Sequence, residues 1–346
     1  MRRQPAEWAL HEAVWIGWPS AADLWEGDLE PARGEVESFI RAVLFPGGLT
    51  RGERVNLLAR GAESIRAAED MRRRLPDPAH LTIHEAPIGD VWLRDTGPIF
   101  VDDGGQLGAS VFRFNGWGGK YELPEDDRIA SIVAGIAKTP LARFGDLIAE
   151  GGALETDGDG TFITTRQCLL NPNRNPGLTE SDIEAVLQEA LGAEKVIWLD
   201  DGLLGDHTDG HVDNLARFAA PGTIICMHPT GADDPNKEVL AEIQRALAGA
   251  TDAGGRRLDV VEIPSPGRAL LDGAPAAASH MNFYIANNSV VMPSYVELTG
   301  NAGAVDEALD ILGKAINRPF AHAIGSAHLL TGGGSFHCIS QQQPSL

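Results

Sequence analysis

The sequence predicts an α/β fold built from mixed sheets or from a propeller-like arrangement of modules. Short apolar strand-like segments alternate with amphipathic helical segments along the whole chain. Hairpins interrupt this alternation, which argues against a doubly wound parallel sheet, where a helix follows nearly every strand. No long linker and no Pro/Ser-rich boundary divides the 346 residues, so we expect one domain spanning residues 1–346.

The expected elements of the first half follow from apolar patterning and from residues that end helices. Pro76 ends a helical segment because proline cannot continue a helix. The run Asp102-Asp103-Gly104-Gly105 is typical of a hairpin turn. We therefore expect strands at Glu53–Ala59, Leu81–Ile88, Ile99–Val101, Ala109–Phe114 and Thr161–Leu170, and helices at Ala62–Leu75 and Arg128–Ala137.

The second half repeats this order. Thr179 is a plausible N-cap for a helix that ends before Gly192. Asn287-Asn288 is typical of a second hairpin turn. We expect helices at Thr179–Leu191, Lys237–Leu247 and Val305–Ile316, strands at Lys195–Leu199, Leu258–Ile263, Phe283–Ala286 and Val290–Pro293, and mixed structure over His322–Leu330.

The composition excludes several classes of protein. There are 28 basic and 49 acidic residues, a formal net charge of −21, so the surface repels phosphate backbones and argues against nucleic-acid binding. This charge can attract a small cation, although solubility alone also explains it. No apolar run approaches the roughly 20 residues needed to cross a bilayer, and the start MRRQPAEW lacks the apolar segment of a secretory signal. We expect no membrane partner.

Three widely spaced cysteines favour a reducing cytoplasm, because they form no disulfide framework and no CxxC pair. Cys338 follows three glycines in GGGSFHCISQQQP, where flexible backbone and polar neighbours suit a nucleophile. A buried structural cysteine is the alternative. Cys168 and Cys226 lie in segments expected to be apolar strands, and we interpret both as structural.

The segment Leu203–Phe218 concentrates aspartates and histidines. If Gly210–Asn214 is extended, His211 and Asp213 point to the same face, which pairs a base with a carboxylate. Three interpretations stay open from these residues alone: the acid/base group of a cysteine enzyme, a metal site, or a polar surface loop.

Two further segments carry acidic residues. In Gly89–Val101, Asp90 and Asp95 bracket Trp92, which is either a core aromatic or a pocket wall. Glu150 precedes two glycines, and the Asp-Gly-Asp-Gly run that follows is typical of a tight turn and lacks the glutamate of an EF-hand. There is no GxGxxG and no P-loop, so the sequence gives no support for a nucleotide cofactor.

Carboxylates around a thiol raise its pKa and weaken it as a nucleophile. That cost makes sense if the substrate is itself a cation. A guanidinium is planar, permanently charged and matched to carboxylates in bidentate geometry, so the residues point to guanidine chemistry as one inference.

Six motifs together resemble the agmatine deiminase family, the bacterial type of peptidyl-arginine deiminase. They are PAEWALHEAVWIGWP at Pro5–Pro19, DVWLRDTGP at Asp90–Pro98, EGG at Glu150–Gly152, CLLNPNRNPGLT at Cys168–Thr179, TDGHVDN at Thr208–Asn214 and GGGSFHCISQQQP at Gly332–Pro344. The resemblance covers the whole chain. It implies a pentein α/β-propeller, with five ββαβ-like modules around a pseudo-fivefold axis and the site in the central channel.

The resemblance also implies hydrolysis of agmatine to N-carbamoylputrescine and ammonia, without metal or organic cofactor. It implies that Cys338 is the nucleophile, that His211 is the general acid/base, and that Glu150 supports both His211 and the substrate. It further implies that Asp95 and Asp213 clamp the guanidinium. The further substrate-binding candidates are Asp90, Trp92, Trp117, Gly333 and Gly334.

The chain departs from the family pattern in two places. His207 stands where members often have an acidic residue, and Ser335-Phe336 replaces the usual Asn-Ile. Alternatives are a deiminase acting on arginine, methylated arginine or peptidyl-arginine, a metal-dependent hydrolase using His207 and Asp209 with His211 and Asp213, and a non-catalytic pentein binding module. The sequence does not decide whether copies of the chain form a homo-oligomer.

Overall fold

The computed structural model describes residues 2–48 and 51–346, in which one order of elements recurs. An antiparallel hairpin is followed by a helix and then by a strand parallel to the second hairpin strand. Four units have this order: β5 (Ile99–Asp103), β6 (Leu107–Arg113), α6 (Asp126–Ile136) and β7 (Leu141–Ile148); β8 (Glu155–Thr156), β9 (Thr161–Thr165), α8 (Glu180–Leu191) and β10 (Lys195–Leu199); β11 (Ala216–Ala220), β12 (Thr223–His228), α9 (Lys237–Gly249) and β13 (Asp259–Pro264); β16 (Tyr284–Ile285), β17 (Ser289–Ser294), α11 (Ala302–Ile316) and β18 (Phe320–Gly325).

A further sheet joins the two ends of the chain. The C-terminal strand β19 (Ser340–Pro344) pairs antiparallel with β2 (His11–Gly17), which is followed by α2 (Leu29–Leu44) and the parallel strand β3 (Val55–Ala59). Helix α3 (Gly61–Arg73) connects β3 to β4 (Leu81–Glu85), and β4 extends the sheet by pairing parallel with β3. Cys338, the candidate nucleophile, lies just before β19. The pairing of β19 with β2 therefore also positions Cys338.

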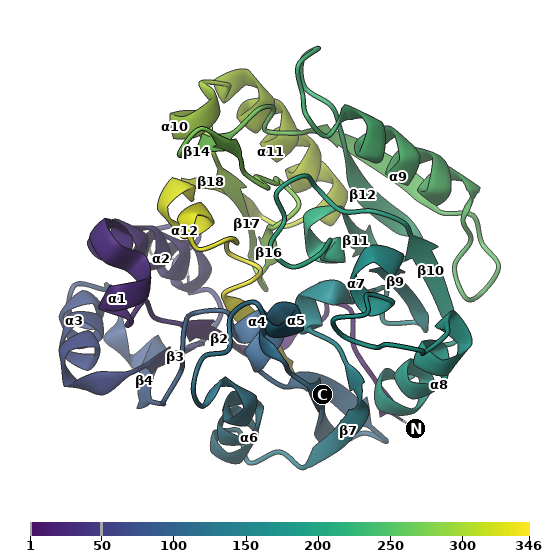
Figure 1. The fold of residues 1–346 in the computed structure, drawn as a ribbon. Helices are drawn as coiled ribbons and strands as arrows, with labels where there is room; N and C mark the ends of the chain where they lie inside the picture. The colour runs from purple at the N-terminus through teal and green to yellow at the C-terminus, as the bar shows by residue number, and fades with distance from the viewer. Residues whose placement is uncertain (1, 49–50) are drawn as a thin grey trace.

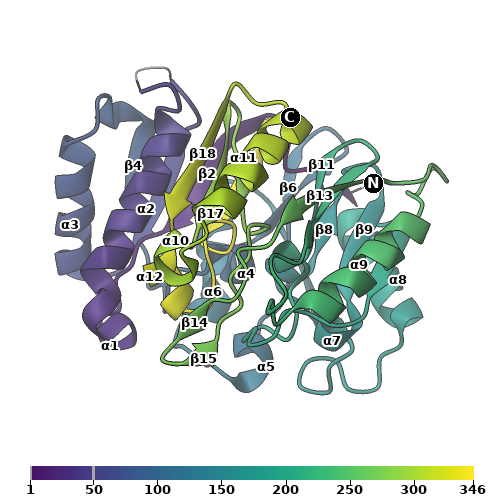
Figure 2. The same cartoon turned by 90° about the horizontal axis from the view of Figure 1, so that it is seen from above.

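The long helices lie on the outside and the strands lie toward the middle (Figure 1). Helices contact sheets other than their own: α2 packs on β17 and β18, and α11 packs on β13 as well as on β18. Figure 2 shows the same molecule from above, with α2 and α3 on one side and α8 and α9 on the other. Neighbouring units therefore share their apolar cores, which fixes their relative positions.

Short elements connect these units. They are β1 (Arg2–Arg3), β14 (Leu270–Leu271), β15 (Ala274–Pro275), α1 (Ala22–Trp25), α4 (Leu93–Thr96), α5 (Gly116–Gly119), α7 (Arg166–Leu169), α10 (Val296–Thr299), α12 (Ala327–Thr331), and the 3₁₀ turns Glu26–Asp28, Pro78–His80, Gly151–Ala153 and Val212–Asn214. Within the described residues, no helix is both long enough and apolar enough to cross a membrane.

Most of the expected elements are confirmed, and each sheet of a repeated unit mixes parallel and antiparallel pairs. The hairpins around Asp102–Gly105 and Asn287-Asn288 form as expected. Helix α8 has the expected cap, a box formed by Thr179 and Asp182, and Gly192 ends it in the left-handed region.

Two expectations are wrong. The strand expected over Thr161–Leu170 ends at Thr165, because the Thr165 hydroxyl accepts the N–H of Cys168 and starts the helical turn α7. The segment Gly210–Asn214 is not extended, since Val212–Asn214 is a 3₁₀ turn. Both corrections fall beside the cavity described below.

Asp126 anchors the segment that leads into this cavity. One carboxylate oxygen accepts the N–H of Gly89 at 2.6 Å, and the other is buried with no hydrogen-bond partner in the described part of the chain. Burial, with Asp90 nearby, raises the pKa of Asp126 to about 7.

A folded-state pKa of about 7 means that the folded protein binds one more proton than the unfolded chain between about pH 4 and pH 7. The stability that protonated Asp126 contributes is therefore lost as pH rises through this range. We expect the free energy of unfolding of the wild type to fall relative to Asp126→Asn by up to about 4 kcal/mol from pH 4 to pH 7. Urea titrations measure this difference. Asp127→Asn, at an exposed neighbour, is the control and should show no such trend.

Candidate active site

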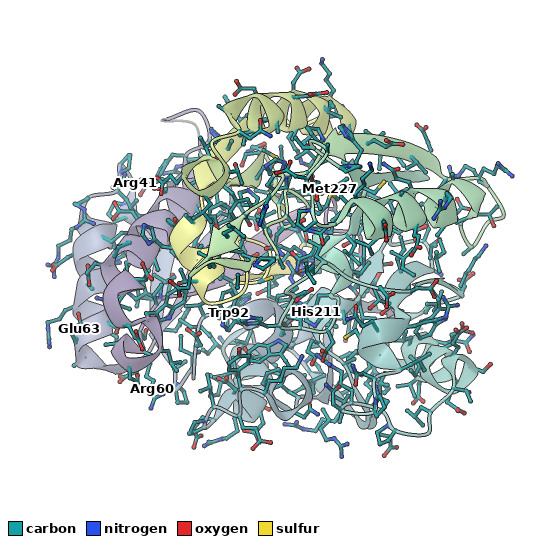
Figure 3. The ribbon with its side chains drawn as sticks, turned by 45° about the horizontal axis from the view of Figure 1, so that its top comes forward. Arg41, Arg60, Glu63, Trp92, His211 and Met227 are labelled. Carbon is teal, nitrogen blue, oxygen red and sulfur yellow. The ribbon has the colours of Figure 1, made fainter. Side chains whose placement is uncertain are left out.

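A cavity lies in the middle of the molecule. The space inside it that the centres of water molecules can occupy has a volume of about 180 Å³. Its lining includes Cys338, Asp95 and Asp90, the aromatic side chains Trp92, Trp117 and Tyr121, and the loop Gly332–Gly334. Figure 3 shows Trp92 and His211 near the centre, whereas Arg60 and Glu63 lie at the edge. A small molecule can therefore reach the thiol through an aromatic passage.

The glycine loop has the close contacts that its sequence predicts. Gly333 has a φ of 101°, which favours glycine. A Cβ on Gly334 would lie 2.6 Å from the Trp92 ring and 3.1 Å from Cys338 Sγ, and a Cβ on Gly332 would lie 2.7 Å from Trp92. Side chains at these positions would fill the cavity.

Cys338 is held by Asn282, a residue that sequence analysis missed. Asn282 Nδ2 donates to Cys338 Sγ at 3.0 Å, and Asn282 Oδ1 accepts the backbone N–H of Cys338 at 3.2 Å. Asp213 Oδ2 lies 3.5 Å from the sulfur. Burial, together with Asp213 and Asp95, raises the pKa of the Cys338 thiol well above its ordinary value. Without a bound cation, the thiol form is favoured.

Asp95 lies on the turn α4 and receives only neutral hydrogen bonds. The indole N–H of Trp117 and the backbone N–H of Gly152 donate to its two oxygens, both at 2.8 Å. Burial, with Asp213 and Glu150 nearby, raises the pKa of Asp95. Asp95 therefore offers a carboxylate to the cavity without a fixed Lys or Arg partner among the described residues.

His211 lies fully buried between two carboxylates. Its Nδ1 is 3.8 Å from Asp95, its Nε2 is 3.6 Å from Glu150, and neither nitrogen has a hydrogen-bond partner among the described residues. Burial alone would lower the pKa of His211, but the carboxylates outweigh it and raise this pKa well above its ordinary value. A Cβ on Gly152 would lie 2.6 Å from His211 Nδ1, 3.0 Å from Asp95 and 3.1 Å from Asp213, so the three groups converge at this glycine.

Arg174 balances the charge of Glu150. Its Nε donates to both oxygens of Glu150, at 2.9 and 3.0 Å, and a terminal nitrogen bonds Asp209 at 2.7 Å. Burial alone would raise the pKa of Glu150, but His211 and Arg174 hold it below its ordinary value. Glu150 therefore stays ionised beside His211.

Asp213 is positioned by a second histidine. The two ring nitrogens of His337 lie 2.8 Å from Asp213 and 2.9 Å from Glu7. Glu7 in turn pairs with the buried Arg217 at 2.8 Å. Burial alone would raise the pKa of Asp213, but His337 and His211 lower it. Asp213 thus also stays ionised next to the thiol.

Asp90 lies on the cavity wall beside Trp92 and bonds the indoles of both Trp92 and Trp25. Each indole N–H donates to one of its oxygens at 2.9 Å. Burial raises the pKa of Asp90 to about 6. Asp90, one of the substrate-binding candidates from the sequence, is thus part of the cavity lining.

The structure brings together the residues that the sequence singled out. Those that line the cavity are Cys338, Asp95, Asp90, Trp92, Trp117, Gly333 and Gly334, and those directly behind it are His211, Glu150 and Asp213. Sequence analysis gave no role to Arg174, Asn282 or His337. The first lies in the CLLNPNRNPGLT motif, and the third precedes Cys338, so both had a signal, whereas Asn282 had none.

The interpretation of Cys168 is also corrected. It lies on α7 rather than in a strand, and its thiol is 3.9 Å from Glu150 Oε2. Cys226 lies in β12 as expected. The proposed metal set of His207, Asp209, His211 and Asp213 does not assemble among the described residues, because His207 contacts Tyr121 and Asp209 pairs with Arg174.

The sequence model of the Porphyromonas-type peptidyl-arginine deiminases matches residues 3–344. The chain belongs to this family. It is 37% identical to the agmatine deiminase of Stutzerimonas stutzeri, with 99% of this chain and 95% of that protein covered. The agmatine deiminase of Enterococcus faecalis matches the structure with a TM-score of 0.89 at 30% identity, covering 99% and 96% of the two chains. A C. jejuni agmatine deiminase variant with substrate bound matches with a TM-score of 0.87 at 26% identity, covering 100% and 97%.

These similarities confirm the pentein α/β fold class that the resemblance implied. They also agree with the recurring hairpin, helix and parallel strand of the four repeated units.

The pairing of Arg174 with Glu150 predicts a large stability effect. Arg174→Met leaves the buried Glu150 without its cation, so we expect the free energy of unfolding to fall by about 3–5 kcal/mol. Arg166→Met is the control, because Arg166 pairs with the more exposed Glu180 and Asp200 and should lose at most about 1 kcal/mol. Adding Glu150→Gln to Arg174→Met should recover part of the loss. Equal losses in the two arginine variants, measured by urea unfolding, would contradict this account.

Proposed function

We propose that this chain hydrolyses agmatine to N-carbamoylputrescine and ammonia through a covalent thiouronium intermediate on Cys338. The observation that carries the proposal is the charge of the cavity. Asp95 and Asp90 line it, Asp213 lies behind it, and among the described residues no lysine or arginine lines it. The cavity is suited to a small organic cation, and among the described residues its lining offers no lysine or arginine to an α-carboxylate.

The names of the relatives support the same substrate. Relatives whose similarity extends over nearly the whole chain are agmatine deiminases, and one of them is described with its substrate bound.

Asp95 and Asp213 bind the guanidinium nitrogens and hold the central carbon within about 3–3.5 Å of the Cys338 sulfur. The aliphatic arm lies between Trp92 and Trp117, whose faces also attract a cation. The Gly333–Gly334 backbone leaves room for the substrate. The distal ammonium of agmatine occupies the passage beside Asp90. The indoles of Trp25 and Trp92 hold the two oxygens of Asp90 in place.

The substrate cation offsets the carboxylate field that disfavours the thiolate. Cys338 releases its proton to solvent as the substrate binds, its thiolate attacks the guanidinium carbon, and Asn282 donates a hydrogen bond to the sulfur. His211 gives a proton to the departing nitrogen from Nδ1, the ring atom nearer Asp95, and ammonia leaves. Glu150 holds the charge on His211 from the Nε2 side.

Hydrolysis of the intermediate uses the same groups in reverse. His211 accepts a proton from water, which attacks the thiouronium carbon. The carbon–sulfur bond breaks, and Cys338 returns as a thiolate while the ureido product leaves. No metal or organic cofactor takes part in this scheme.

Two alternatives are disfavoured by particular observations. A free arginine would place its carboxylate near Asp90 without a lysine or arginine partner among the described lining residues. A non-catalytic binding module has no need for a thiol, a histidine and ionised carboxylates that converge at Gly152.

We further propose that residues 1–346 act as one catalytic domain, a propeller of five ββαβ-like modules with the cavity near its pseudo-fivefold axis. Support comes from the four repeated units and from the sheet completed by β19. We place the protein in the cytoplasm, because its three cysteines are unpaired.

Ammonia release with agmatine, arginine and a blocked arginine peptide tests the proposal, with EDTA present throughout. We expect agmatine to react at least about 100-fold better in kcat/KM than either alternative. The arginine carboxylate would be repelled by Asp90 at a cost of several kcal/mol, and the blocked peptide lacks the distal ammonium that Asp90 attracts. Cys338→Ala should abolish release while agmatine binding stays detectable by calorimetry. Cys226→Ala, a buried thiol on β12, is the matched control and should keep activity. Release from arginine or the peptide at the agmatine rate would overturn the substrate assignment.

A further inference from the structure

Cys168 is a second thiol at the active site, and the mechanism above does not use it. It is fully buried on α7, lies 3.9 Å from Glu150 Oε2, and has its sulfur within 4.8 Å of a ring nitrogen of His211. The turn that holds it is fixed by Thr165, whose hydroxyl also donates to the carbonyl of Gly210, next to His211. The thiol therefore has a fixed position relative to the histidine.

The three groups have the spacing of metal ligands. One ligand atom each from Glu150, Cys168 and His211 lies within 4.8 Å of the others. Bond lengths to tetrahedral zinc place nitrogen and oxygen ligands about 3.4 Å apart, and sulfur and oxygen ligands about 3.6 Å apart. The observed distances are 3.6 Å from His211 Nε2 to Glu150 Oε2 and 3.9 Å from Cys168 Sγ to the same oxygen. A shift of a few tenths of an ångström would complete these two tetrahedral edges, and the third pair, Cys168 and His211, already has its ligand atoms within 4.8 Å of each other.

The chemistry of the cluster fits the same ion. Imidazole, thiolate and carboxylate are the three kinds of side chain that bind zinc in proteins. His211 Nε2 is fully buried without a hydrogen-bond partner among the described residues, so a ligand there displaces no existing bond. Arg174 already orients Glu150, as outer groups orient metal ligands elsewhere. Asp95 and Asp213 add negative charge close by.

We propose that Glu150, Cys168 and His211 form a binding site for Zn²⁺ that switches the enzyme off. Binding releases the thiol proton of Cys168 and any proton on His211 Nε2 to solvent, and it forms bonds from zinc to sulfur, nitrogen and oxygen. The ion enters through the cavity, whose lining residue Asp95 lies 3.8 Å from His211.

Zinc on Nε2 prevents His211 from carrying protons on both nitrogens, so it cannot act as the acid for departing ammonia. The dication also repels the guanidinium. This inhibition rests on the proposed function, whereas metal binding does not.

Binding is tested first with Co²⁺ as the spectroscopic probe on the purified, EDTA-treated and desalted protein. A cobalt–thiolate bond gives near-ultraviolet charge-transfer absorption. We expect this absorption to saturate at one Co²⁺ per chain in the wild type and in Cys338→Ser. It should be absent in both Cys168→Ser and Cys168→Ala, and circular dichroism checks that these variants fold. No absorption in the wild type, or absorption that is lost with Cys338 instead of Cys168, would overturn the proposal.

Inhibition is tested with agmatine in a second experiment. We expect Zn²⁺ to stop ammonia release in the wild type, with EDTA restoring it. Relative to its own metal-free rate, Cys168→Ser should need at least tenfold more Zn²⁺ for half-inhibition. Equal sensitivity of the two proteins would contradict the switch. If metal-free protein releases no ammonia from agmatine, the proposed function fails, and the cobalt titration still decides the metal site.

Discussion

The arrangement of the site depends on three buried carboxylates whose charges are balanced in different ways. Arg174 pairs directly with Glu150, and His337 lies between Asp213 and Glu7. Asp95 receives only N–H groups of Trp117 and Gly152. Because a buried carboxylate without a cation is costly, the site is completed by a cation that arrives with the substrate. The same field keeps Cys338 a thiol until then.

This charge balance needs segments from the whole chain. Glu7 comes from the N-terminal segment, Arg217 from β11 and His337 from the residues before β19, and they meet in one buried network. The pairing of β19 with β2 brings the chain ends together, and the sharing of helices between sheets fixes the units relative to one another. The β19–β2 pairing and the shared helices therefore set the distance between the thiol and the carboxylates, because the site residues come from several units.

Sequence patterns predicted a helix or strand well where the residues that start it, end it and give it its apolar face all lie within that element or next to it. Helix α8 is an example, because its cap, apolar face and final glycine are all local. The strand expected over Thr161–Leu170 failed because one hydroxyl at Thr165 ends it, which apolar content does not reveal. The candidate residues with acidic, thiol or imidazole groups do converge around the cavity. Asn282 and Arg174 were missed because their importance lies in contacts with Cys338 and Glu150, which are 56 and 24 positions away.

The central claim is that the free protein holds Cys338 as a thiol against surrounding carboxylates. The most direct measurement is the pH dependence of iodoacetamide alkylation at Cys338, followed by peptide mass analysis with EDTA present. The account predicts an alkylation pKa for Cys338 above that of an ordinary cysteine, about 8.5. It also predicts that Asp213→Asn lowers this pKa, because it removes the nearest negative charge. A wild-type alkylation pKa near or below 7 would show a thiolate formed without substrate and would contradict the account.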